Sequence, residues 1–166
     1  MTVDSFKYLP RSFRPGFESV GYQHDEPAWT TLETPIEEAT IALLSSAGIY
    51  IEGQQQPFDL DRERANPNWG DPTYRVIPRD VPQERVRVAH LHINGRDIER
   101  DINVALPLRA FAELESEGRI GRLADEHYSF MGFQHRSLAD WRGTQIPELA
   151  GRLKEAGVSA LVLAPA

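Results

Sequence analysis

The feature that most restricts the fold of this chain is an almost continuous apolar run over residues 158–164. A strand that alternates apolar and polar residues has one face in water, whereas an uninterrupted run is typical of a parallel strand buried on both faces. A helical pattern with Pro147 in its first turn precedes the run, and Gly157 separates the two. The segment therefore predicts a helix followed directly by a buried strand.

The same order of helix, glycine and strand is predicted earlier in the chain. Thr34, Pro35 and Glu37 form the capping pattern of a helix start, and apolar residues follow at helical spacing. We therefore expect a helix over residues 36–47, ended by a glycine, and a short strand over 49–51. Two such units predict an α/β fold, a three-layer sandwich with a small, mostly parallel sheet.

Between these units the sequence predicts further elements. Residues 86–93 have the pattern of a long strand, and a helix is predicted to open at Pro107. Residues 53–83 form a long polar connection, within which 73–77 is predicted as a short strand. A connection of this length is usually functional or bound to a partner. Residues 127–132 are predicted as a loop.

The first 33 residues differ in character from the rest. Proline and glycine punctuate them, which predicts irregular structure. They also carry more aromatic residues than a disordered tail does, namely Phe6, Tyr8, Phe13, Phe17, Tyr22 and Trp29. We therefore interpret residues 1–33 as an irregular aromatic arm that packs on the domain or on a partner subunit, and residues 34–166 as one α/β domain.

Charge and composition exclude several classes of partner. The formal net charge is −7, and no stripe of lysine and arginine is present, so neither nucleic acid nor an anionic membrane surface is an expected partner. No apolar run approaches the roughly 20 residues that span a bilayer. The N-terminal residues resemble neither a signal peptide nor a transit peptide, which predicts a cytoplasmic protein.

The chain contains no cysteine. This excludes a disulfide framework, a thiolate zinc site and a cysteine nucleophile within these 166 residues.

Two histidines on the predicted strand 86–93 could hold a metal. His90 and His92 share one face of an extended strand, about 7 Å apart by the strand rise. With His127 and Asp101 they would form a donor set that suits a divalent ion such as zinc or iron. The alternative is structural, since paired histidines also occur on half-buried strands where each ring bonds to a neighbour.

Asp101 and Asn103 precede the helix that opens at Pro107. Both residue types cap helices, and capping is one interpretation of this pair. The other is substrate binding, because open α/β sheets bind ligands in the crevice beside their strand ends. The two roles are compatible.

The segment His127 to Gly132 has the most unusual composition of the chain. His127 titrates near neutral pH and can transfer protons, and Ser129 can donate to an oxyanion, so both are candidate catalytic residues. Tyr128 is a candidate substrate-binding residue. No acid is in place to orient the histidine, so a serine triad is not supported. The alternative is a packed turn in which Phe130 and Met131 fill the core.

A series of short segments resembles one known family. The segments are Gln56-Pro57-Phe58-Asp59, Gly70-Asp71, Arg75-Val76-Ile77-Pro78, His90-Leu91-His92, Asp101-Ile102-Asn103, Pro107-Leu108, Glu117-Gly118-Arg119-Ile120-Gly121 and the six residues from His127 to Gly132. Their order resembles the selenoprotein B family of the glycine, sarcosine, betaine and D-proline reductases, and the D-proline reductase small subunit in particular. The resemblance runs from about residue 33 to Ala166.

This resemblance implies an oxidoreductase. In the family a selenocysteine, or a cysteine in its place, attacks the substrate beside a second subunit that carries a pyruvoyl group. The selenocysteine motif lies just past a strand that looks like residues 160–164. This chain offers the scaffold without the nucleophile. Either it has lost the reductive chemistry, or an in-frame UGA codon downstream was read as a stop.

Three functions follow from the sequence. The first is a reductase-like subunit that acts on a small amino acid or amine-like substrate, with His127 and Ser129 as catalytic residues. The second is a metal-dependent or acid–base lyase, hydrolase or isomerase that uses His90, His92 and His127. The third is a non-catalytic subunit of an oligomeric complex. The aromatic arm and the long connection over residues 53–83 predict a homo-oligomer or a partner subunit.

Overall fold

The computed structural model describes residues 11–12, 30–66, 68–134 and 137–166. The chain divides into two units, residues 1–31 and 32–166. The aromatic arm predicted over residues 1–33 falls almost wholly outside the described residues. The α/β architecture belongs to the second unit.

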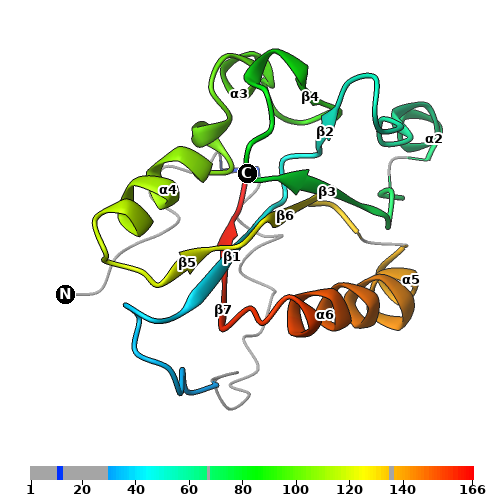
Figure 1. The fold of residues 1–166 in the computed structure, drawn as a ribbon. Helices are drawn as coiled ribbons and strands as arrows, with labels where there is room; N and C mark the ends of the chain where they lie inside the picture. Colours follow the sequence, from blue (N-terminus) through cyan, green and yellow to red (C-terminus); the bar gives the residue numbers. More distant parts are fainter. Residues whose placement is uncertain (1–10, 13–29, 67, 135–136) are drawn as a thin grey trace. The chain divides into compact units, whose positions relative to one another are not determined.

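The main sheet is built around β1 (Thr40–Ser45) (Figure 1). On one side β1 pairs in parallel with β7 (Ala160–Ala164). On its other side two short strands follow one another, β5 (Arg122–Leu123) and β6 (Glu126–Phe130), both parallel to it. β3 (Tyr74–Pro78) adds antiparallel to β6. The prediction of a small, mostly parallel sheet is confirmed.

Helices cover both faces of this sheet. Leu43 of β1 belongs to the larger hydrophobic cluster, which includes residues of α3 (Arg96–Arg100) and α4 (Leu108–Ser116). Its neighbour Leu44 points to the opposite face and packs with α6 (Ile146–Glu155). Since adjacent residues of a strand point to opposite faces, β1 is buried from both sides, as a three-layer α/β sandwich requires.

The helix predicted over residues 36–47 is wrong, because this segment contains β1. The capping pattern instead forms a tight turn, in which the Glu38 N–H donates to the Pro35 carbonyl (2.9 Å). The apolar residues that follow are buried on both faces of the sheet. Their spacing fits a helix only because a fully buried strand has no polar positions to break the pattern.

The remaining strands form a small second sheet. β2 (Ile49–Ile51) pairs antiparallel with β4 (Val86–Val88). The short strand predicted at 49–51 is confirmed, and the one predicted at 73–77 is β3. The strand predicted over 86–93 ends at Val88, after which the chain bends.

The other helices are short. α2 (Leu60–Ala65) lies within the segment predicted as a polar connection. Two 3₁₀ helices follow, η1 (Gln83–Arg85) and η2 (Ile102–Val104). α5 (Leu138–Asp140) and the π-helical segment η3 (Trp141–Gln145) lead into α6. No helix in the described part of the chain is long and apolar enough to cross a membrane.

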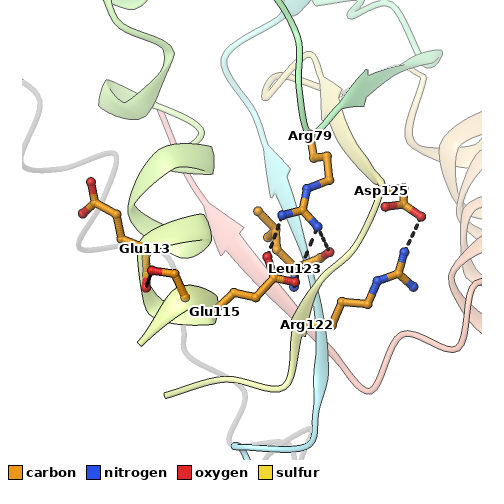
Figure 2. Close-up of polar contacts among 7 residues, drawn as sticks. Arg79, Glu113, Glu115, Arg122, Leu123 and Asp125 are labelled. Carbon is orange, nitrogen blue, oxygen red and sulfur yellow. Dashed lines mark hydrogen bonds and ion pairs between the residues drawn. The ribbon is translucent and has the colours of Figure 1, made fainter. Parts of the chain in front are cut away.

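An ion pair binds the backbone of β5, as Figure 2 shows. Arg79 and Glu115 pair at 2.6 Å. The Arg79 guanidinium also donates to the Leu123 carbonyl (2.9 Å), and Glu115 accepts from the Leu123 N–H (3.1 Å). The two side chains therefore bind the N–H and the carbonyl of Leu123, the groups that a neighbouring strand would otherwise bind.

Candidate functional site

The segment predicted as a loop over residues 127–132 is mostly strand. Residues 126–130 form β6, so that prediction is wrong. Along a strand, side chains alternate between faces. His127 and Ser129 therefore share one face, whereas Tyr128 points to the other, where it packs with Leu44 and Leu149. The predicted catalytic pair and the predicted substrate-binding tyrosine do not line one pocket.

His127 lies opposite the break between β5 and β6. β1 pairs with β5 up to Ile41 and with β6 only from Leu44. At the break, the Leu43 N–H donates to Nδ1 of His127 (3.0 Å). The imidazole thus replaces a backbone carbonyl that an unbroken strand would supply.

The environment of His127 keeps the ring neutral. The side chain is fully buried, and this burial lowers its pKa to about 4. Since Nδ1 accepts a hydrogen bond, it carries no proton, and the proton of the neutral ring is on Nε2. At neutral pH His127 therefore does not gain a proton easily.

Ser129 and Tyr128 are also engaged. The Ile49 N–H donates to the Ser129 hydroxyl (2.8 Å), which ties β2 to β6. The Tyr128 hydroxyl donates to Glu126 (3.3 Å), which in turn pairs with Arg152 at 2.7 Å. Burial raises the pKa of Tyr128. Each of the three neighbouring side chains therefore has a structural contact.

Asp101 and Asn103 cap helices, so the capping interpretation is confirmed. The Asp101 carboxylate accepts from the Asn103 backbone N–H (3.1 Å) and side-chain amide (2.8 Å), which lower its pKa. The Asn103 amide oxygen accepts from the Arg109 N–H of α4 (2.9 Å). Asp101 is exposed and Asn103 is half-buried. Substrate binding by this pair stays a prediction.

His90 and His92 lie close together in the bend after β4. Their ring centroids are 5.8 Å apart. Nδ1 of His90 accepts from the His92 N–H (3.1 Å), and burial lowers the pKa of His90. Among the described residues, no group of three or more potential ligands is placed to hold a metal ion. The predicted metal site therefore has two imidazoles in contact, but within the described part of the chain they belong to no group of three donors placed to hold a metal ion.

A buried carboxylate lies next to this pair. Glu63 of α2 is 2% exposed, and its Oε1 lies 3.8 Å from Nε2 of the exposed His92. Within the described part of the chain, neither carboxylate oxygen has a hydrogen-bond partner. Burial accordingly raises the pKa of Glu63. This residue was not singled out from the sequence, where it resembles ordinary loop charge.

The structure also forms an apolar groove of about 460 Å³ between α6 and the sheet. Phe130 and Trp141 stack at its wall, with ring centroids 4.8 Å apart. Ser46 and Ala164, at the carboxyl ends of β1 and β7, also line it. Ligands of open α/β sheets bind near such strand ends. The sequence signals this groove only through the apolar spacing of Trp141 and the α6 leucines.

Comparison with known proteins places these features in a family. The model of the glycine/sarcosine/betaine reductase selenoprotein B family matches residues 25–166. The D-proline reductase subunit gamma of Acetoanaerobium sticklandii is 32% identical over 139 residues, which cover 82% of this chain and 52% of that protein. The glycine reductase complex component B subunit gamma of Carboxydothermus hydrogenoformans is 27% identical over 135 residues, which cover 77% and 28%.

The chain thus spans about half the length of the first of these relatives and less of the second. No solved structure matches it.

Proposed function

Because the chain belongs to the glycine/sarcosine/betaine reductase selenoprotein B family, we propose that it is a subunit of a reductase complex that acts on a small amino acid or amine-like substrate. The extent of the family match carries this proposal. Residues 25–166 include every strand and helix of the α/β unit, so the whole sandwich is shared with the family. The names of both relatives include an amino-acid reductase.

The proposal places the reacting thiol or selenol outside these 166 residues. The sequence has no cysteine, so the nucleophile must come from a further segment or from a partner polypeptide. The binding of a divalent metal ion at His90 and His92 stays a prediction. The proposal itself needs none.

Within the complex, we expect His127 and Ser129 to act as supports. Their side chains bind the backbone of β1 and β2 and are fully buried. Direct catalysis by either would require a substrate to reach its buried side chain. The contacts therefore favour a positioning role, and catalysis by His127 or Ser129 stays a prediction.

The proposal is tested on the complex as the cell assembles it. The chain would be tagged at its chromosomal locus and purified with its associated subunits. D-proline, glycine, sarcosine and betaine would each be supplied with dithiothreitol as electron donor, and the products identified by mass spectrometry. We expect one of the four to be reduced.

The control is a mock purification from the untagged strain. Recovery of the folded chain with no second subunit, or of a complete complex that reduces none of the four compounds, would contradict the proposal.

A further inference from the structure

Asn94 and Gly95 form the one asparagine–glycine pair of the sequence. Asparagine is a thermolabile residue, because the backbone nitrogen of the residue that follows can attack its side-chain amide. Glycine hinders this attack least, since it has no Cβ. The environment of that nitrogen in the fold therefore decides how readily an asparagine reacts.

The fold requires the glycine at position 95. A Cβ at Gly95 would lie 2.7 Å from Cβ of Val88 and 3.0 Å from its Cγ1. A close-packed interior has no room for such an approach without a shift of its neighbours. Val88 in turn is held in β4, where it pairs with Ile49 of β2. The packing of the second sheet thus keeps a glycine directly after Asn94.

The two groups that would react are both accessible to each other and to water. Among the described residues, the Gly95 N–H has no hydrogen-bond acceptor. The Asn94 side chain is exposed, and its Oδ1 accepts from the Arg96 N–H (3.3 Å). Attack at Cγ of Asn94 moves negative charge onto Oδ1. A donor that is already directed at this oxygen stabilises the charge as it develops.

Two of the other asparagines are followed by a nitrogen that is not free to attack. Asn66 precedes Pro67, and proline has no N–H. Asn68 precedes Trp69, whose N–H donates to the Asn66 carbonyl (2.8 Å). A nitrogen held in this way must lose its hydrogen bond before it reacts. Both asparagines are exposed, so exposure alone does not distinguish Asn94.

The last asparagine, Asn103, is held at its side chain as well as at the nitrogen that follows. Its amide donates to Asp101 (2.8 Å), and its amide oxygen accepts from the Arg109 N–H (2.9 Å). The Val104 N–H donates to the Asp101 carbonyl (3.2 Å). In the part of the chain that the structure describes, Asn94 alone combines an exposed amide with a free nitrogen after it.

We propose that Asn94 deamidates spontaneously in the folded protein. The Gly95 nitrogen bonds to Cγ of Asn94, and its proton leaves with the side-chain nitrogen as ammonia. Water then opens the resulting succinimide at either carbonyl, which gives aspartate or isoaspartate. Each product adds one negative charge, and isoaspartate also adds a methylene to the backbone between β4 and α3. The inference is independent of the proposed reductase role.

The first test follows the folded chain as it ages. The full chain is incubated for several days in water enriched in heavy oxygen and then digested briefly with trypsin in ordinary water, so that deamidation during digestion adds no label. The peptide of residues 88–96 should carry the label as a mixture of aspartate and isoaspartate. The peptide of residues 101–109, which contains Asn103, is the internal control and should stay unlabelled.

The rate shows whether the folded state itself reacts. It should lie within about tenfold of the rate of the free peptide of residues 88–96, because reaction through the unfolded fraction alone would be slower by about 1,000-fold or more. A rate in that slower range, no label in residues 88–96, or equal labelling of the two peptides overturns the proposal.

The second test separates the longer backbone from the added charge. Gly95 packs on Val88, whose N–H donates to Glu99 of α3 (3.1 Å), so isoaspartate at position 94 should loosen α3. Aged wild type should therefore unfold at a lower urea concentration than fresh protein. Asn94→Asp should match fresh wild type, and Asn94→Gln should not change on ageing. No loss in aged wild type, or an equal loss in either variant, contradicts an effect of isoaspartate at this position.

Discussion

His127 shows how a polar side chain can support the backbone of a buried sheet. The Leu43 N–H that it accepts has no strand partner at the break between β5 and β6. A buried donor left without an acceptor costs about 1–3 kcal/mol. His127 therefore satisfies the Leu43 N–H at the point where β1 passes from pairing with β5 to pairing with β6.

Substitution of His127 should reveal this role. His127→Phe removes the acceptor, and we expect the free energy of unfolding to fall by about 2–3 kcal/mol. His127→Asn can place an amide oxygen near the position of Nδ1 and should lose less. Urea denaturation of the two variants beside the wild type measures the difference. If Phe is tolerated as well as Asn, the hydrogen bond to Leu43 contributes nothing.

The same residue predicts a dependence of stability on pH. Burial lowers the pKa of His127 from 6.5 to about 4, so the folded protein holds the ring neutral while the unfolded chain protonates it. This contribution to stability is complete above pH 6.5 and is lost as the pH falls toward 4, by about 3 kcal/mol in all. Unfolding free energies of the wild type and His127→Asn should therefore converge over this range. A constant gap between them would contradict the shift.

At the scale of elements, Arg79 and Glu115 join α4 to the sheet through Leu123 (Figure 2). Each is less than one-third exposed. The hydrogen bond from Arg79 holds the pKa of Glu115 below its usual range, so the pair is ionised at neutral pH. The two side chains thus neutralise each other's charge and also bind the N–H and the carbonyl of Leu123.

Loss of Glu115 should accordingly weaken the link between α4 and β5. Glu115→Ala leaves the Leu123 N–H and the Arg79 charge without their partner, and we expect a loss of about 2 kcal/mol in the free energy of unfolding. Glu113→Ala is the matched control, because Glu113 is exposed on the same helix and points away from Arg79 (Figure 2). Equal losses of unfolding free energy in the two variants would contradict a specific contribution from the contacts of Glu115 with Leu123 and Arg79.

Elements with clear end signals could be predicted, and the buried strands were the hardest. α4 and α6 are followed by Gly118 and Gly157 at a φ of +66°, a conformation that glycine adopts readily. β1 was mistaken for a helix because its leucines and alanines favour helices, while burial on both faces decided for a strand. β6 was mistaken for a loop because its polar residues bond to the backbone inside the core.

At the scale of the molecule, residues 34–166 were predicted to fold as one domain, which a truncated chain can test. All the residues of the three hydrophobic clusters lie between Ile41 and Val162, within this range. A chain of residues 34–166 should therefore unfold in a single cooperative transition and keep the circular dichroism of the full chain above 210 nm. A broad, non-cooperative melt would show that the preceding residues complete the core.

The candidate site could be predicted only in part. Sequence order identified the family, and residue chemistry identified Asp101 and Asn103 as caps. Which residues converge depends on the faces of strands and on breaks in pairing, and these follow from tertiary contacts. Tyr128 and His127 are adjacent in the chain yet lie on opposite faces of the sheet, and Glu63 meets His92 across 29 positions of sequence.

The buried carboxylate of Glu63 also predicts the order in which parts of the fold open. Its oxygens have no hydrogen-bond partner among the described residues, so water becomes available to them only when α2 lifts away. Opening α2 alone therefore lets water hydrate the Glu63 carboxylate, and this gain in free energy favours the local opening of α2. Amide hydrogens of α2 should exchange with deuterium well before those of β1, and Glu63→Gln should slow this exchange. We therefore expect α2, within the segment predicted as a long polar connection, to behave as a separate, early-opening unit of the native state.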